Sequence, residues 1–198
     1  MLFNLRRQSA DFFGGMILIV NRREFLKLSA STLVVGCLPF PALAAISDNA
    51  PSRRRLAFYN THTGESLDIC YFGREGYNRK ALDQIFHLLR DHRAGRTHPI
   101  DLQLLDTLYA VKLAVKPGTP FHVISGYRTP ATNGMLRKQT SGVARTSYHT
   151  KGRAIDIRLP GFRTDRLKNL CIALRSGGVG YYPDSNFVHV DTGPVRNW

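Results

Sequence analysis

The chain has 198 residues, with 28 Lys and Arg against 14 Asp and Glu, which gives a formal net charge of +14. Hydrophobic residues make up 43% and charged residues 21%, which is typical of a globular protein and not of a disordered or collagen-like one. The length suits one domain with a short extension. Beyond the N-terminal region no apolar stretch of roughly 18 residues occurs, so a mature protein with several membrane spans is excluded.

Residues 1–45 are predicted to be an N-terminal extension that ends in a twin-arginine signal peptide. The segment 21–27, Asn-Arg-Arg-Glu-Phe-Leu-Lys, is close to the twin-arginine pattern. An apolar stretch over 28–43 follows, and Ala-Leu-Ala at 42–44 is a small-x-small cleavage site. This order of features predicts a periplasmic protein that contacts the membrane only transiently, during export.

Two alternatives remain open in this extension. The segment 34–37, Val-Val-Gly-Cys, resembles a lipoprotein cleavage box, which would anchor the protein through Cys37. The residues that follow it are unusually apolar for a mature lipoprotein start. Met16 lies five residues before the signal, so translation could begin at Met16 and not at Met1.

The part of the chain after residue 45 keeps 23 basic and 12 acidic residues, a net charge of +11. Such a charge favours an anionic partner. Nucleic acid is the usual first candidate, but the predicted export argues against nucleic acid and favours an anionic polymer of the cell envelope. Charge alone leaves a solvated basic surface without a partner as the alternative.

Two cysteines, Cys70 and Cys171, remain in this part. An oxidising compartment permits a disulfide between them. Cys70 lies in a strand-like run and Cys171 in a helical one, so two buried thiols are an equally open alternative.

The pattern of apolar residues predicts one α+β domain over 56–198, preceded by a polar linker over 46–55. We expect a small antiparallel sheet with flanking helices. In chain order, the expected elements are a hairpin of strands over 56–59 and 66–72, helices over 78–93 and 101–116, a strand over 121–124, a helix over 129–140, a strand over 154–159, a helix capped by Thr164 to about residue 176, and a strand pair over 179–182 and 187–191.

Three residues have the composition of a catalytic zinc site. Two His and one carboxylate, His149, Asp156 and His189, would leave a fourth position open. Strand alternation places His189 and Asp191 on one face and the flanking valines on the other, and it sets Asp156 between two isoleucines. Polar groups that interrupt apolar strands need partners, and a metal would satisfy them.

The segment 147–156 fits, without a gap, the signature Ser-x-His-x-x-Gly-x-Ala-x-Asp. This is the signature of the zinc peptidases that include D-Ala-D-Ala carboxypeptidases, lysostaphin-type enzymes and hedgehog domains. Four more stretches, 62–66, 125–128, 177–183 and 185–194, resemble one branch of that group, the MepK-type murein endopeptidases. The resemblance extends from about Leu56 to Trp198.

This resemblance implies a hedgehog/D,D-peptidase-like fold and a periplasmic zinc enzyme that cuts peptide cross-links in peptidoglycan. The partner would be the peptide stems of murein, an acidic polymer that agrees with the positive charge. The resemblance makes His149, Asp156 and His189 the ligands of Zn²⁺. It also implies that Arg128 steadies the substrate carbonyl and the developing oxyanion. We expect Ser147 to hydrogen-bond near the metal or to substrate.

The sequence departs from the resemblance at the general base. Many relatives place a Glu three residues before the last His ligand, but Asn186 occupies that position and cannot take a proton. Asp191 is the nearest replacement, and an equally open alternative is that Asp191 orients His189. Tyr181 could line the cleft, although a core position is equally open to it.

Two other functions remain compatible with the sequence. A non-hydrolytic, hedgehog-like zinc protein would keep the fold and the metal without a working base. A basic, metal-free murein-binding module would need neither.

Overall fold

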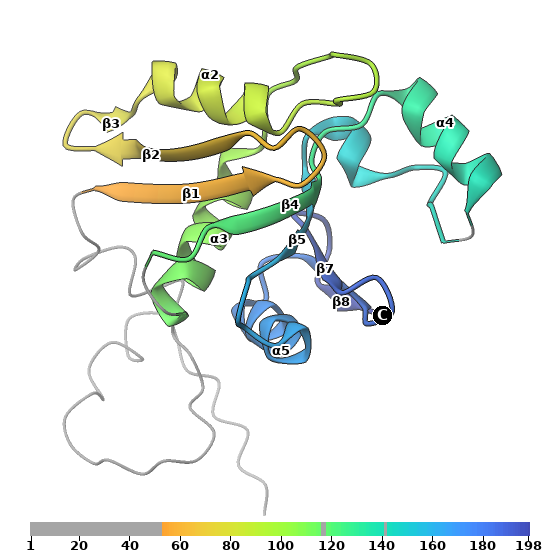
Figure 1. Cartoon of the computed structure of the whole chain (residues 1–198). Coiled ribbons are helices and arrows are strands. Elements are labelled where there is room, and N and C mark those ends of the chain that lie inside the picture. The colour runs from red at the N-terminus through yellow and green to blue at the C-terminus, as the bar shows by residue number, and fades with distance from the viewer. Residues whose placement is uncertain (1–52, 116–117, 141) are drawn as a thin grey trace, which may run out of the picture. The chain divides into compact units, whose positions relative to one another are not determined.

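The computed structural model describes residues 53–115, 118–140 and 142–198 (Figure 1). The predicted export signal, its cleavage site, both possible start residues, Cys37 and positions 46–52 of the predicted linker lie outside the described residues. The first strand, β1, begins at Arg54, two residues before the predicted start of the domain.

In the part of the chain that the structure describes, eight strands form one sheet in the order β3-β2-β1-β4-β5-β7-β6-β8. Their bounds are β1 Arg54–Asn60, β2 Ser66–Gly73, β3 Gly76–Tyr77, β4 Phe121–Ser125, β5 Ala154–Arg158, β6 Gly178–Tyr182, β7 Phe187–Asp191 and β8 Arg196–Asn197. The predicted α+β class is confirmed. The sheet is larger than expected and mixed, because β1 pairs in parallel with β4 and β6 with β8.

The alternation of apolar and polar residues does not predict either parallel pair. Strands β1 and β4 are separated by β2, β3 and two helices, and a connection of this length allows the chain to return in the same direction. Strand β8 has only two residues, so it carries no alternation from which a strand could be predicted.

Within the described residues four α-helices and a short 3₁₀ helix accompany the sheet. They are α2 Arg79–Leu88, α3 Leu102–Ala114, α4 Pro130–Gln139, α5 Thr164–Leu174 and the 3₁₀ helix η2 Tyr148–Lys151. Buried residues of α2, α3 and α5 form one hydrophobic cluster with the strands. Helix α4 contributes nothing to that cluster and is part of the connection from β4 to β5 (Figure 1).

Three helix starts follow the sequence prediction closely. Asn78 accepts a hydrogen bond from the Ala81 amide, and Asp101 accepts one from the Gln103 amide. Thr129 accepts one from the Thr132 amide and is followed by Pro130 at the first helical position. These caps are local signals, so the sequence alone identifies them.

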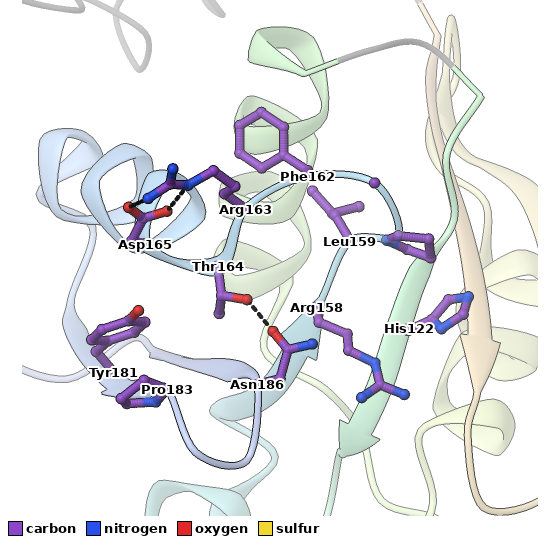
Figure 2. Close-up of a pocket in the computed structure, with 12 residues that line it drawn as sticks. His122, Arg158, Leu159, Phe162, Arg163, Thr164, Asp165, Tyr181, Pro183 and Asn186 are labelled. Atoms are coloured by element: carbon purple, nitrogen blue, oxygen red, sulfur yellow. Dashed lines mark hydrogen bonds and ion pairs between the residues drawn. The ribbon is translucent and has the colours of Figure 1, made fainter.

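Two helix ends differ from the prediction. Helix α2 ends at Leu88 and not near residue 93, because the carboxylate of Asp91 accepts the amides of Arg93 and Ala94 and holds a turn there. The cap of α5 is Arg163, which makes no capping bond with its side chain. The Thr164 hydroxyl is not the cap, since it donates to the Asn186 side chain instead (Figure 2).

Within the described residues Cys70 and Cys171 do not form a disulfide. Cys171 is buried in α5, and burial raises the pKa of its thiol to about 12. None of the helices among the described residues combines the length and the apolarity that crossing a bilayer requires.

The two faces of β5 prepare the site. Ile155 and Ile157 are fully buried and belong to the hydrophobic cluster. Asp156 lies between them in the sequence and on the opposite face by alternation. Strand β5 itself lies between β4 and β7 (Figure 1). A strand at the centre of the sheet, with a covered apolar face, therefore presents a carboxylate on its other face.

Candidate metal centre

Three buried side chains gather where β5, β7 and η2 meet. Asp156 and His189 pair directly across the antiparallel strands β5 and β7, and His149 comes from η2. His149 Nε2 lies 3.2 Å from both Asp156 Oδ1 and His189 Nδ1, and His189 Nδ1 lies 2.8 Å from Asp156 Oδ1. The residues that the sequence predicted as ligands therefore form one cluster that could hold a metal ion.

A hydrogen bond on the far side of each imidazole fixes which nitrogen faces this cluster. His149 Nδ1 lies 2.7 Å from the Gly126 carbonyl oxygen, which can only accept, so Nδ1 carries a proton. His189 Nε2 lies 3.1 Å from the Asp191 carboxylate, and the same argument places a proton on Nε2. In the neutral imidazoles, the nitrogens that face Asp156 therefore present lone pairs.

Three electron-rich atoms at these distances need a positive charge among them. Two imidazole nitrogens and a carboxylate oxygen suit a divalent transition metal, and the outer hydrogen bonds hold both rings in the orientation that such an ion requires. The residues present therefore fit a metal ion.

In the metal-free protein, a proton on His189 supplies the positive charge among these three side chains. Burial lowers the pKa of His149 more than the nearby Asp156 raises it, so His149 is neutral. Burial also opposes a charge on His189, but hydrogen bonds to Asp156 and Asp191 outweigh it and raise the pKa of His189 to about 9. The histidine partners hold the pKa of Asp156 well below its usual range despite burial.

Asp191 is fully buried and its carboxylate is fully engaged. One oxygen accepts the Gly178 amide at 3.1 Å and the Gly193 amide at 2.8 Å, and the other lies 2.7 Å from the Arg196 guanidinium as well as next to His189. Burial would raise the pKa of Asp191, but these donors hold it well below its usual range. A carboxylate with so low a proton affinity is a poor general base, so the geometry favours the alternative in which Asp191 orients His189.

Arg128 follows β4 and lies beside the three candidate ligands. Its Nη2 is 4.0 Å from Asp156 Oδ2, and its backbone amide donates to the His149 carbonyl at 3.2 Å. The Nε atom is buried without a hydrogen-bond partner. Burial lowers the pKa of the guanidinium, and the nearby Asp156 partly offsets this. A largely buried guanidinium is thus held next to the candidate ligands.

Ser147 supports the cluster through the backbone. Its hydroxyl accepts the amide of His149 at 3.3 Å, and its carbonyl oxygen accepts both the amide and the hydroxyl of Thr150. These bonds start the short helix η2 and place His149 within it.

Asn186 and Tyr181 do not contact the candidate ligands. Asn186 lies in the turn between β6 and β7 with a φ of 51°, and its side chain meets that of Thr164. The ring of Tyr181 lies under the Lys168 ammonium, 4.9 Å from the ring centroid, next to α5. Both residues line a separate open pocket at the end of β5 (Figure 2).

Sequence reasoning missed two residues that position the site. Asp91 accepts the amide of Thr129 at 2.8 Å and its hydroxyl at 2.9 Å, which holds the loop that carries Arg128. The sequence pattern predicted that Asp91 lies inside a helix, so it did not identify Asp91 as a residue that positions the site. Gly126 lies so close to the backbone of Leu89 that an added Cβ would be 2.4 Å from its carbonyl oxygen. The Ser-Gly turn at 125–126 was a usable signal.

An aromatic pair also borders the cluster. The indole ring of Trp198 lies 5.4 Å from the His189 imidazole, measured between centroids, and its Nε1–H donates to the Tyr182 hydroxyl at 3.0 Å. Trp198 reaches this position because β8 pairs with β6. A strand of two residues carries no pattern that predicts this pairing.

Comparison with known proteins places this geometry in a family context. Residues 48–198 match the family model described as "Peptidoglycan L,D-endopeptidase MepK". A protein of that name from Escherichia coli (strain K12) is 43% identical over 178 residues, which cover 90% of this chain and 97% of that protein. The Shigella flexneri protein of the same name gives the same values. A "Probable peptidoglycan L,D-endopeptidase MepK" from Haemophilus influenzae is 42% identical over 180 residues, 90% of this chain and 95% of that protein.

The proton on His189 predicts that metal affinity rises with pH. A metal must displace this proton at any pH below about 9, so the affinity of the metal-free protein should increase about tenfold per pH unit between pH 6 and 8. Titration with Co²⁺, followed by its visible absorption, measures the slope. An affinity that does not change over this range would contradict the assigned proton.

Asp191→Asn tests the source of that proton affinity. The variant removes one of the two carboxylates that raise the pKa of His189. The increase of metal affinity with pH should therefore level off at a lower pH than in the wild type. The substitution also weakens the orientation of the ring, so affinity at pH 8 should fall about 10- to 100-fold. Asp184→Asn, in the exposed turn after β6, is the matched control and should behave as the wild type.

Proposed function

The chain belongs to the peptidoglycan L,D-endopeptidase MepK family, and we therefore propose that it is a zinc metallo-endopeptidase that hydrolyses peptide cross-links of peptidoglycan. The observation that carries this proposal is the convergence of His149 Nε2, His189 Nδ1 and Asp156 Oδ1 in one buried cluster. Two histidines and one carboxylate with an open fourth position are the ligands of a catalytic zinc ion and not of a closed structural one.

Zinc is the metal that we propose for this centre. When bound, it would act as a Lewis acid on the scissile carbonyl and lower the pKa of a coordinated water molecule toward 7. The residues of the chain hold the site in place. Gly126 and Asp191 fix the two imidazoles, and the paired strands β5 and β7 hold Asp156 opposite His189.

Arg128 is proposed to stabilise the carbonyl oxygen as it becomes negative. Its guanidinium is mostly withdrawn from water, lies with Nη2 4.0 Å from Asp156 Oδ2, and is anchored beside His149 through the backbone. A fixed donor in a site that excludes water stabilises developing charge without reorganisation.

Asp191 is proposed to be a positioning residue. It keeps the proton on His189 Nε2 and so directs Nδ1 toward the metal. Asn186, at the position where many relatives carry a base, hydrogen-bonds to Thr164 and not to a candidate ligand. In this proposal the proton acceptor for the attacking water is neither Asn186 nor Asp191.

Hydrolysis of purified murein tests the proposal. The protein without residues 1–45 should release cross-linked muropeptides as shorter products, lose this activity on exhaustive chelation and regain it with Zn²⁺. His149→Ala should abolish both metal binding and hydrolysis, because one of three ligands is lost. His87→Ala, an exposed histidine on α2, is the matched control.

The outcome also separates the two other functions. Zinc binding without hydrolysis would indicate a hedgehog-like protein without peptidase activity. Binding to murein without a metal would indicate a basic wall-binding module. Full hydrolysis after chelation would rule out a metallopeptidase.

The role of Arg128 predicts a change in rate without a change in metal content. Arg128→Ala should lower turnover about 10²- to 10³-fold, as the loss of an oxyanion donor does. Bound zinc and the thermal midpoint should stay close to those of Arg166→Ala, which removes an exposed arginine on α5. Near wild-type turnover would show that Arg128 has a structural role only.

We also propose that the twin-arginine pathway exports the protein to the periplasm, where its substrate lies. The net charge of +11 after residue 45 suits an acidic polymer and does not require nucleic acid as a partner. The alternative of a lipid anchor through Cys37 would retain the protein at the membrane.

Export depends on one arginine pair in this proposal. Replacing Arg22 and Arg23 with Lys should leave the precursor in the cytoplasm, as should a strain without the twin-arginine translocase. Replacing Arg6 and Arg7 with Lys is the matched control, since this pair lies outside the signal pattern. Cell fractionation measures the distribution, and unchanged periplasmic yield in the translocase-deficient strain would disprove the route.

A further inference from the structure

A second pocket lies at the end of β5, next to the candidate metal centre. An open pocket with a volume of about 700 Å³ is bordered there by the β5–α5 loop and by the turn between β6 and β7. Thr164 and Asn186 join these two segments by a hydrogen bond, and Arg158 points into the space between them and β4 (Figure 2).

Arg158 is the free positive charge of this pocket. Its side chain has no ion-pair or hydrogen-bond partner among the described residues, and it is half-buried. The other arginine of the pocket, Arg163, forms an ion pair of 2.6 Å with Asp165, so these two charges cancel. Burial and the nearby Arg158 lower the pKa of His122, so that imidazole is neutral at pH 7. One uncompensated guanidinium therefore sets the charge of the pocket.

Strand geometry relates Arg158 to the metal cluster. Arg158 follows Asp156 by two residues on β5, so alternation places both on the face opposite Ile155 and Ile157. At a rise of about 3.3 Å per residue, their Cα atoms are about 7 Å apart. An extended peptide with its scissile bond at the metal would therefore bring an adjacent residue to Arg158.

We propose that Arg158 is a specificity-determining residue that binds a free carboxylate of the stem peptide next to the scissile bond. The proposal rests on the proposed function of the metal centre and names the substrate group that this pocket recognises. A guanidinium offers paired donors that match a carboxylate. Any peptide stem with a free C-terminus carries such a group. His122 pairs with Arg158 across β4 and β5 and supplies a neutral wall for the same group.

The test compares two forms of one substrate. Cross-linked muropeptide dimers with free carboxylates and the same dimers with their carboxylates amidated are given to the metal-loaded protein. The wild type should prefer the free carboxylates, measured as the ratio of kcat/KM values. Arg158→Gln should lower this preference about 10- to 100-fold, the usual effect of losing a hydrogen bond to a charged group. Arg158→Lys should restore part of it.

Arg166→Gln removes an arginine from α5 outside the pocket and should keep the wild-type preference. A preference that survives in Arg158→Gln would overturn this proposal while the peptidase assignment stands. Equal losses on both substrates in Arg158→Gln and Arg158→Lys, with metal content measured for each, would assign a structural role and also overturn it. Cleavage of neither form by the wild type would overturn the proposed function and this inference together.

Discussion

The site depends on one electrostatic constraint. Two imidazole nitrogens and a carboxylate oxygen, none of them exposed, are held about 3 Å apart, and only a proton or a metal ion among them makes this arrangement stable. The Gly126 carbonyl and the Asp191 carboxylate remove the alternative in which the rings turn their protons inward. The metal centre is thus prepared by groups that do not touch the metal.

Close backbone contacts of the surrounding loops hold these side chains in place. Gly126 can offer its carbonyl to His149 because it lacks a Cβ, which would collide with the Leu89 backbone. Asp91 accepts the amide of Arg93 in the turn that follows α2, and its carboxylate also accepts the amide of Thr129. Arg128 lies between these two anchor points, so its placement beside the metal cluster follows from the packing of its neighbours.

Alternation along the central strand β5 places core residues on one face and functional residues on the other. Its isoleucines join a core shared with α3 and α5, while Asp156 and Arg158 face the other way. A rigid strand buried on one face is a stable support for functional groups on the other. This arrangement lets one short segment contribute to both the metal cluster and the adjacent pocket.

The sequence by itself determined the α+β class, most helix starts and which three residues gather in the candidate metal centre. Caps such as Asn78 and Thr129 act over three residues, and the period of two in β5 and β7 places Asp156 and His189 on definite faces. These signals are local, so no knowledge of packing is needed to interpret them.

Only the tertiary structure decided what each side chain meets. The weak proton affinity of Asp191 comes from His189, from Arg196 and from the amides of Gly193 and Gly178. The sequence spacing of Asp191 and His189 does not reveal the contacts with Arg196, Gly193 and Gly178. Asn186 and Tyr181 stand near His189 in the sequence, but a turn and strand alternation direct them to another pocket. The physical reason is that burial, charge pairing and strand order arise from contacts between segments that are distant in sequence.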